Sequence, residues 1–183
     1  MGYPNQVQEW PKLLKPVSDE QGANAAVAVL LKIRDGDLNV LLVKRVENSV
    51  DPWSGQMAFP GGKRDPKDQS LMQTIVRETL EETNINLQVS CRFLGALKAT
   101  HSKPKPDLKI LPFVILVERE QPIRLSEKEL AGFFWIPLRD ITKAEGEAQL
   151  SIGRVPAYIV GPLVIWGLTY RIIKDFIRTV ALV

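Results

Sequence analysis

The amino-acid sequence predicts an α/β fold in which a mixed sheet is packed between helices. Apolar, partly β-branched segments typical of strands are interspersed with two segments of helical periodicity, without strict strand–helix–strand alternation. The chain has 183 residues, of which 45% are hydrophobic and 25% charged, an ordinary globular composition. We find no internal repeat or linker, so residues 1–183 are expected to form a single domain.

The chain begins with a polar segment that is followed by a predicted hairpin. Residues 1–22 are polar and contain several prolines, and we expect an irregular or short helical lead-in. Ala25–Ile33 is apolar and partly β-branched, which favours a strand. Asp35-Gly36 then favours a tight turn, so Leu38–Val43 is predicted to be the return strand.

A long loop and the first helix come next. We expect a loop over Val46–Gly62 and a helix from about Asp68 to Thr83, with Asp68 as the N-cap ahead of the apolar pattern. One helix face is predicted from residues at helical spacing, namely Met72, Val76, Leu80 and Thr83.

The second half of the chain is predicted to complete the sheet and to end in a helix. Strands are expected near Leu87–Leu97, Ile110–Val117 and Gly132–Ile136, with a polar loop over Thr100–Leu108. The C-terminal helix is expected to start near Ile165, with one apolar face made by Leu168, Ile172, Phe176 and Val180.

The composition limits which cellular compartment and which partners are expected. A single cysteine, Cys91, excludes an intramolecular disulfide and suits a reducing cytoplasm; its alternating neighbours place it on a strand. The net charge of +3 fits an anionic small-molecule substrate, and no Lys/Arg cluster is dense enough to indicate a nucleic-acid partner. No signal peptide or membrane span is predicted, and the sequence leaves a homodimer open.

The most informative segment places three carboxylates on one helix. Glu78 lies three residues before Glu81 and four before Glu82, so all three share one side within about one turn. A hard divalent cation such as Mg²⁺ would offset their mutual repulsion. Arg77, four residues before Glu81, can pair with it, and the preceding Gly61-Gly62 could bring a backbone carbonyl close to the same cation. The alternative is an ordinary solvated helix face.

This segment closely resembles the Nudix box, G-x5-E-x7-R-E-U-x-E-E-x-G-U, in which U is apolar. Arg77-Glu78 and Glu81-Glu82 match its central pairs, and Ile85 matches its last position. The chain departs from the box in four ways. The stretch from Gly62 to Arg77 is one residue longer, Asp68 or Gln69 replaces the first Glu, Thr79 fills an apolar position, and Asn84 replaces the final Gly.

The resemblance implies a fold and a chemistry. Nudix proteins form an α/β/α sandwich with a mixed sheet, the box (residues 61–85 here) forms loop–helix–loop, and members hydrolyse diphosphates of nucleoside derivatives. By carry-over, Glu78, Glu81, Glu82 and the carbonyl of Gly62 would hold Mg²⁺ or Mn²⁺, which neutralises phosphate charge and activates water. Box glutamates, with Arg77, then become the candidate catalytic residues. In some members the base lies on a later loop, where Glu127 and Glu129 stand here.

A narrower resemblance concerns the substrate. Leu41-Leu42-x-x-Arg45, followed by Gly55-x3-Phe59-Pro60-Gly61-Gly62, is similar to the segment preceding the box in coenzyme A pyrophosphatases. That branch has a second Arg after Arg45, which this chain lacks. Coenzyme A is therefore the first candidate substrate, while ADP-ribose, NADH or a noncanonical nucleoside triphosphate is the alternative. A nonhydrolysing nucleotide sensor is disfavoured because all three box carboxylates are present.

A few residues outside the box are candidates for substrate contact. Lys103 and Lys105, in a basic loop, could meet further phosphates, and Arg45, just before the long loop, is a candidate for substrate binding. His101 is expected to be solvated or to touch substrate. Trp53 could stack on a base or pack its loop, whereas Trp166 is interpreted as a core or interface aromatic.

Overall fold

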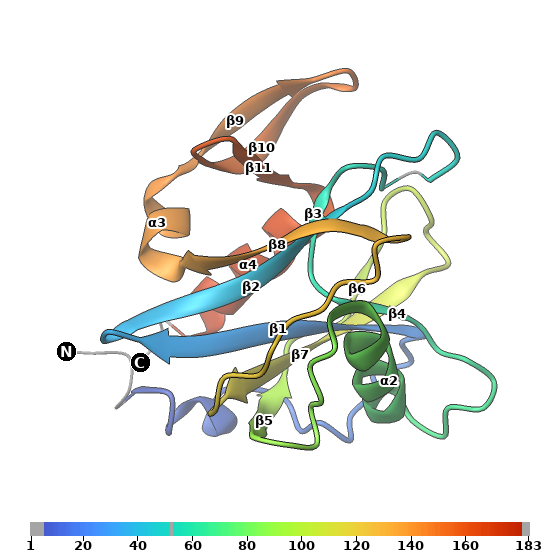
Figure 1. Ribbon diagram of the computed structural model, residues 1–183, viewed down its shortest axis with the longest axis vertical. Coiled ribbons are helices and arrows are strands. Elements are labelled where there is room, and N and C mark those ends of the chain that lie inside the picture. Colours follow the sequence, from blue (N-terminus) through green and yellow to red (C-terminus); the bar gives the residue numbers. More distant parts are fainter. Residues whose placement is uncertain (1–5, 52, 181–183) are drawn as a thin grey trace.

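A mixed β-sheet forms the centre of the molecule (Figure 1). The computed structural model describes residues 6–51 and 53–180, so residues 1–5 of the predicted lead-in and residue 52 of the predicted loop lie outside it. The strand order is β3-β2-β1-β7-β5, with β4, β6 and β8 paired to β1, β7 and β2. The pair β1–β7 is parallel and the other pairs in this sheet are antiparallel, which confirms the predicted mixed sheet.

The bounds of the sheet strands follow the prediction closely at its centre and less closely at its edges. The central strands are β1 (Ala25–Arg34), β2 (Asp37–Arg45) and β7 (Lys109–Val117). The sheet is completed by β5 (Cys91–Ala96), which is shorter than predicted, and by β8 (Leu130–Pro137), which is longer. Three short strands lie inside segments that were predicted to be loops: β3 (Met57–Ala58), β4 (Gly61–Lys63) and β6 (Thr100–His101).

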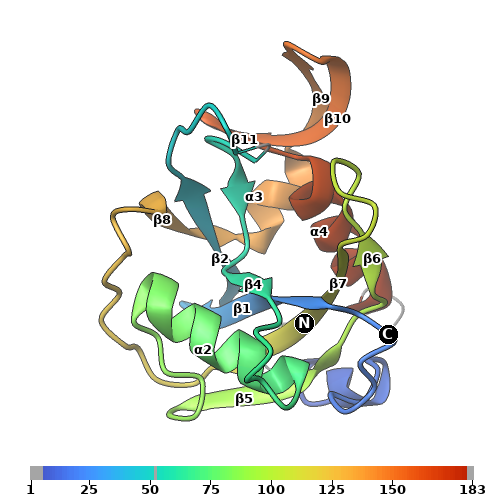
Figure 2. The same cartoon turned by 90° about the vertical axis from the view of Figure 1, so that its right-hand side faces the viewer.

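Two helices, α2 (Leu71–Thr83) and α4 (Gly167–Val180), cover opposite faces of the sheet, as Figure 2 shows. Side chains of β1 alternate between two hydrophobic clusters: Val29 and Leu31 join α4 in one, and Ala28 and Leu30 join α2 in the other. This covering of both faces explains why β1 is almost continuously apolar. The arrangement is the α/β/α sandwich expected from the sequence.

The predicted hairpin is confirmed by its geometry. Arg34 pairs with Asp37 across a two-residue turn, and the turn residues Asp35 and Gly36 have φ angles of 51° and 80°. Positive φ at both positions is what the tight turn requires. Because the turn is this short, it fixes the register in which β2 pairs with β1.

A small projecting sheet was not predicted. It contains β9 (Glu145–Leu150), β10 (Gly153–Val160) and β11 (Leu163–Trp166), and it stands away from the main body in Figure 1. The short helix α3 (Leu138–Lys143) leads into it. The C-terminal helix α4 spans Gly167–Val180, so it starts close to the predicted position near Ile165, although Ile165 itself lies in β11. The predicted face is largely right, since Ile172, Phe176 and Val180 are buried.

The lead-in is tied to the domain by one aromatic side chain. A short 3₁₀ helix, η1 (Trp10–Lys12), places Trp10 fully inside the α4 cluster. Its ring meets Phe176 edge to face, with centroids 5.4 Å apart. The irregular or short helical lead-in is therefore confirmed for the described residues 6–22.

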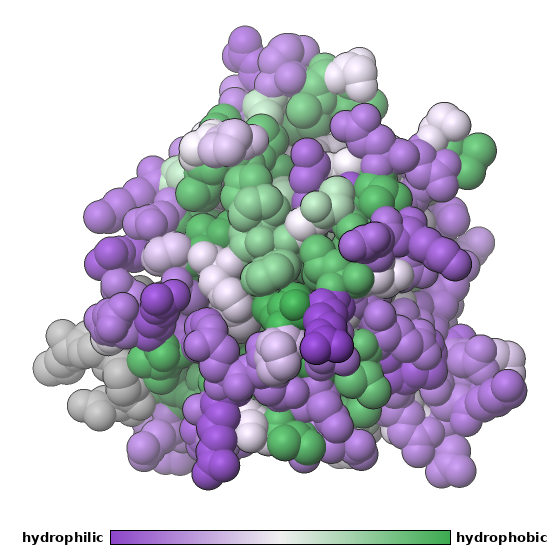
Figure 3. Space-filling model, viewed as in Figure 1, coloured by the Kyte–Doolittle hydropathy of each residue, from purple (hydrophilic) through white to green (hydrophobic). Residues whose placement is uncertain are grey.

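The surface is polar around its rim and hydrophobic in places. Figure 3 shows hydrophobic side chains gathered in the middle of the face seen in Figure 1. Among residues 6–51 and 53–180, no helix combines the length and the hydropathy that crossing a membrane needs. Cys91 lies on β5 as predicted; its thiol is free, and burial raises its pKa to about 11.

Candidate active site

The helix that carries the glutamates, α2 (Leu71–Thr83), begins later than predicted. Ser70 is its N-cap, and the Ser70 hydroxyl accepts a hydrogen bond from the backbone N–H of Gln73. The prediction of Asp68 as N-cap was therefore wrong. At the other end, Asn84 adopts the left-handed conformation with φ of 63°, which explains how it replaces glycine in ending the helix.

The predicted buried face of α2 was also wrong, apart from Thr83. Leu80 is 43% exposed, and Met72 and Val76 are only partly buried. The buried positions are Leu71, Thr74, Ile75, Thr79, Glu82 and Thr83. A count of apolar residues misses this face, because three threonines and one glutamate occupy it.

Two glycines bring the backbone of β4 against both β1 and α2. Gly61 has φ of 148°, and a Cβ atom there would lie 2.2 Å from the carbonyl oxygen of Ala26. A Cβ atom on Gly62 would lie 2.5 Å from the carboxyl carbon of Glu78. The glycine pair therefore permits a close approach between this strand and the glutamates.

Glu82 is the most deeply buried of the three glutamates. Its side chain accepts a hydrogen bond from the backbone N–H of Gly61 at 2.9 Å, and the residue is only 5% exposed. Burial raises its pKa to about 8, and the nearby charges of Glu78 and Glu129 act in the same direction. A negative charge at this place thus needs a cation close by.

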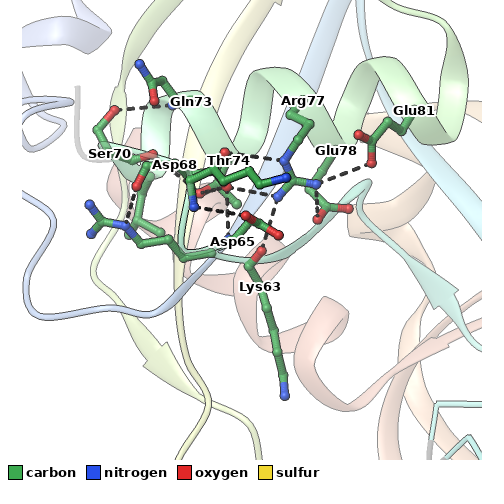
Figure 4. A network of polar contacts seen from close by, with 12 residues as sticks. Lys63, Asp65, Asp68, Ser70, Gln73, Thr74, Arg77, Glu78 and Glu81 are labelled. Carbon is green, nitrogen blue, oxygen red and sulfur yellow. Dashed lines mark hydrogen bonds and ion pairs between the residues drawn. The ribbon is translucent and has the colours of Figure 1, made fainter.

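Arg77 links the other carboxylates into one network (Figure 4). Its guanidinium donates to Glu78 at 2.8 Å, to Glu81 at 3.2 Å and to Asp68 at 2.9 Å. The predicted pairing of Arg77 with Glu81 is confirmed. Glu81 is nevertheless 58% exposed, whereas Glu78 is half-buried, and burial raises the pKa of Glu78 against the opposing effect of Arg77.

Asp68 is a site residue whose role was missed. Its carboxylate accepts from Nε and Nη2 of Arg77 and from the hydroxyl of Thr74. The hydrogen bond from Arg77 lowers the pKa of Asp68 to about 2. Because Arg77 also binds Glu78, Asp68 is linked to this catalytic candidate through Arg77. Its place in the first acidic position of the motif was the available signal.

A cavity of about 180 Å³ opens directly beside the glycine pair. Gly61, Gly62 and Lys63 form one wall, and Arg45 and Trp53 form another. A second cavity of about 200 Å³ shares Trp53, Gln56 and Leu168 with the first and adds Lys103, Trp166 and Arg171. The two cavities therefore adjoin and together extend from the glycine pair to Trp166 of β11.

The predicted substrate residues lie around these cavities. Arg45 lines the first one, held by an ion pair to Asp51 at 2.7 Å. Burial alone would raise the pKa of Asp51, but hydrogen bonds from the Trp53 backbone N–H and from Arg45 hold it below its usual value. The ammonium of Lys105 lies 4.8 Å from the Trp53 ring centroid. Lys103 lines only the second cavity.

The aromatic residues singled out from the sequence lie in different places in the structure. Trp53 lines both cavities, so it is available for stacking while also ordering its loop. Trp166, interpreted from sequence as core or interface, also lines the second cavity and is another candidate contact that sequence reasoning missed. His101 lies on exposed β6, where its Nδ1 is 2.9 Å from the carbonyl of Pro106.

The later loop brings one further carboxylate near the site. The carbonyl of Glu129 accepts a hydrogen bond from the backbone N–H of Val46, and its side chain is exposed. Its charge contributes to raising the pKa of both Glu78 and Glu82. No comparable interaction is found for Glu127 among the described residues. Glu129 therefore remains the stronger candidate of the two for a base.

Comparison with known proteins places this arrangement in a family. The model of the NUDIX domain matches residues 23–154. An uncharacterised Nudix hydrolase, NudL, of Yersinia pestis is 34% identical over 165 residues, which cover 87% of this chain and 81% of that protein. The chain belongs to the Nudix hydrolase family. Nudix hydrolases act on nucleoside diphosphate derivatives and use a divalent metal ion, and this is the enzyme class of the chain.

Other relatives extend the comparison. An uncharacterised protein of Schizosaccharomyces pombe is 37% identical over 118 residues; these cover 62% of this chain but only 36% of that protein. The Nudix domain of Shewanella oneidensis NrtR, solved in complex with ADP ribose, has a TM-score of 0.57 at 20% identity. That match covers 93% of this chain and 96% of the solved one, and it shows a shared fold.

The side chains of the Nudix box offer oxygen ligands to a divalent metal. Within residues 6–51 and 53–180, no three His, Cys, Asp or Glu side chains stand together as a ready-made metal site. Glu78 and Glu81 both pair with Arg77, and Glu78 and Glu82 face the glycine pair. Carboxylates and backbone carbonyls are nonetheless the ligands that Mg²⁺ and Mn²⁺ prefer, and two half-buried or buried carboxylates need a cation. The residues present therefore fit the metal.

Proposed function

We propose that this Nudix hydrolase cleaves the diphosphate linkage of a nucleoside diphosphate derivative, with coenzyme A as the first candidate substrate. The observation that carries the proposal is the half-buried Glu78 and the buried Glu82, which face Gly61 and Gly62 beside a cavity. Acidic oxygens at the mouth of a cavity with a basic wall suit a metal-bridged diphosphate.

Each box residue receives a role in this proposal. Glu78, Glu81 and Glu82, with the carbonyl of Gly62, would hold Mg²⁺ or Mn²⁺. The bound metal supplies neutralisation of the diphosphate charge and activation of the attacking water. Arg77 keeps Glu78 and Glu81 oriented, as its hydrogen bonds indicate.

Residues outside the box are proposed to orient the substrate. Arg45 lies in the cavity wall and would donate to a phosphate, with Asp51 fixing its guanidinium. Lys103 and Lys105 would meet phosphates farther from the scissile bond. Glu129 is the candidate base or additional ligand, because it is the carboxylate outside α2 whose charge reaches both Glu78 and Glu82.

The choice of substrate rests on the segment before the box. Arg45 and the run Gly55–Gly62 resemble coenzyme A pyrophosphatases, and both line or border the first cavity. The missing second Arg favours the alternative, which is ADP-ribose, NADH or a noncanonical nucleoside triphosphate. The NrtR domain, which was solved in complex with ADP ribose, has a similar fold to this chain. This shared fold is the extent of its support for the alternative.

A panel of substrates tests the proposal. The protein is incubated with Mg²⁺ and, at equal concentration, coenzyme A, its 3′-dephosphorylated form, ADP-ribose or NADH. Mass spectrometry identifies the products. We expect phosphopantetheine and 3′,5′-ADP from coenzyme A. If coenzyme A stays intact while ADP-ribose or NADH is cut between its phosphorus atoms, the narrow assignment fails and the diphosphatase assignment stands. If no diphosphate is cut with Mg²⁺ or Mn²⁺, the whole proposal fails.

A further inference from the structure

A basic cavity of about 350 Å³ lies along α4, away from the Nudix box. It is bordered by the chain around β6, by β7 and by one side of α4. It shares no lining residue with the cavity beside Gly61 and Gly62, and it shares Arg171 with the second cavity. Figure 2 shows α4 next to β6 and β7, on the opposite side of the sheet from α2. The charged residues in its wall are Lys98, Arg171, Lys174, Asp175 and Arg178.

The charge of this wall is concentrated and largely unpaired. Four basic side chains and one acidic side chain leave a formal charge of +3, equal to that of the whole chain. Only Lys174 forms an ion pair, with Glu145 at 2.5 Å. Within residues 6–51 and 53–180, no carboxylate lies within ion-pair distance of the remaining basic side chains, Lys98, Arg171 and Arg178. Three cations thus border one hollow without an ion pair, and Asp175 is the one carboxylate among the lining residues.

Arg171 is held in place by neutral groups. Its Nη1 donates to the hydroxyl of Thr100 at 3.1 Å, and its Nη2 donates to the carbonyl of His101 at 2.8 Å. Both acceptors orient the guanidinium but leave its charge in place. Burial lowers the pKa of Arg171, because leaving water disfavours its charged form. An anion in the cavity would stabilise this arrangement.

We propose that this cavity binds a small phosphorylated anion, with Lys98, Arg171 and Arg178 as its ligands. Guanidinium and ammonium groups are the donors that proteins use for phosphate, and a volume of this size lies in the usual range for ligand cavities. This cavity lies apart from the glycine pair of the Nudix box, with Arg171 between it and the second cavity, and anion binding here requires no hydrolysis. Asp175 lies in the same wall and weakens the attraction, so it limits affinity.

Titration with inorganic pyrophosphate tests the site by isothermal calorimetry. The protein is kept in EDTA, so that the box glutamates carry no metal and repel the probe. The double variant Lys98→Ala/Arg178→Ala removes two exposed cations and leaves Arg171 to connect α4 with β6. We expect its affinity to fall about tenfold or more, the scale of losing charge-assisted hydrogen bonds. The matched control, Arg119→Ala/Lys143→Ala, removes two exposed cations elsewhere and should bind almost as the native protein does.

A second variant makes the test two-sided. Asp175→Asn removes the one negative charge of the wall and should tighten pyrophosphate binding, by about fivefold for a charge this close. Amide shifts in the NMR spectrum should change at Thr100, His101 and Arg171, rather than at the box. The proposal is overturned if the native protein binds no pyrophosphate, if both double variants lose affinity equally, or if the shifts concentrate at Gly61–Glu82.

Discussion

Replacing Glu82 by glutamine is expected to lower kcat by about 100-fold or more, the scale of losing a positioned acid–base or charge-stabilising group. Glu82 is the buried member of the carboxylate cluster, and the Gly61 backbone N–H fixes its orientation. Glutamine keeps the shape and the acceptor oxygen for Gly61 but removes the negative charge. Steady-state kinetics on the best substrate of the panel, at saturating Mg²⁺, measure the effect.

The fold of this variant should survive, because an amide is easier to bury than a charged carboxylate. Thermal unfolding checks this point. Glu147→Gln serves as the control, since Glu147 is exposed on the projecting sheet and makes only a 3.6 Å ion pair with Arg154. A Glu82→Gln protein that is folded and retains native kcat would show that the reactive centre lies elsewhere.

Gly61→Ala is expected to destabilise the protein by about 2–5 kcal/mol, from strain at positive φ together with overpacking. The added Cβ would lie 2.2 Å from the Ala26 carbonyl oxygen and 2.7 Å from the Val27 Cα, and both are backbone atoms of β1 that cannot rotate away. Chemical denaturation measures the change in unfolding free energy.

Gly146→Ala is the matched control, because a Cβ atom there meets nothing within 4 Å. Equal stability of the two variants would contradict the close approach of β4 to β1. Gly62 differs from Gly61 in the atoms that a Cβ atom would meet. A Cβ atom on Gly62 meets the carboxyl group of Glu78, the end of a flexible side chain, so that position affects the site more than the backbone.

The sequence predicts those parts of the fold whose structure is determined by residues close together in the chain. Asp35-Gly36 fixes its hairpin through the φ angles of two residues, and Ala25–Ile33 is apolar except for Lys32 because both of its faces are covered. The projecting sheet lacks such a signal. β9 is mostly polar and exposed, and β10 contains a proline, so neither segment has the alternation typical of a strand.

The sequence predicts which glutamates belong to the candidate site but not how they are arranged. Helical spacing places Glu78, Glu81 and Glu82 on one side of α2, yet it treats them as equivalent. Packing against β4 buries Glu82, leaves Glu81 in solvent and puts Glu78 between them. The role of Asp68 depends on a contact nine residues along the chain, across a loop whose path the sequence does not specify.

The central claim is that the carboxylates facing Gly61 and Gly62 bind a divalent metal, and Mn²⁺ binding followed by electron paramagnetic resonance tests it most directly. Metal-free native protein and the double variant Glu78→Gln/Glu82→Gln are titrated with Mn²⁺, with Glu147→Gln as the control. We expect the native protein and the control to bind alike. The double variant should lose affinity by at least about tenfold, the lower end of the loss caused even by residues that only orient metal ligands. Equal Mn²⁺ affinity in the folded double variant and the native protein would contradict the claim.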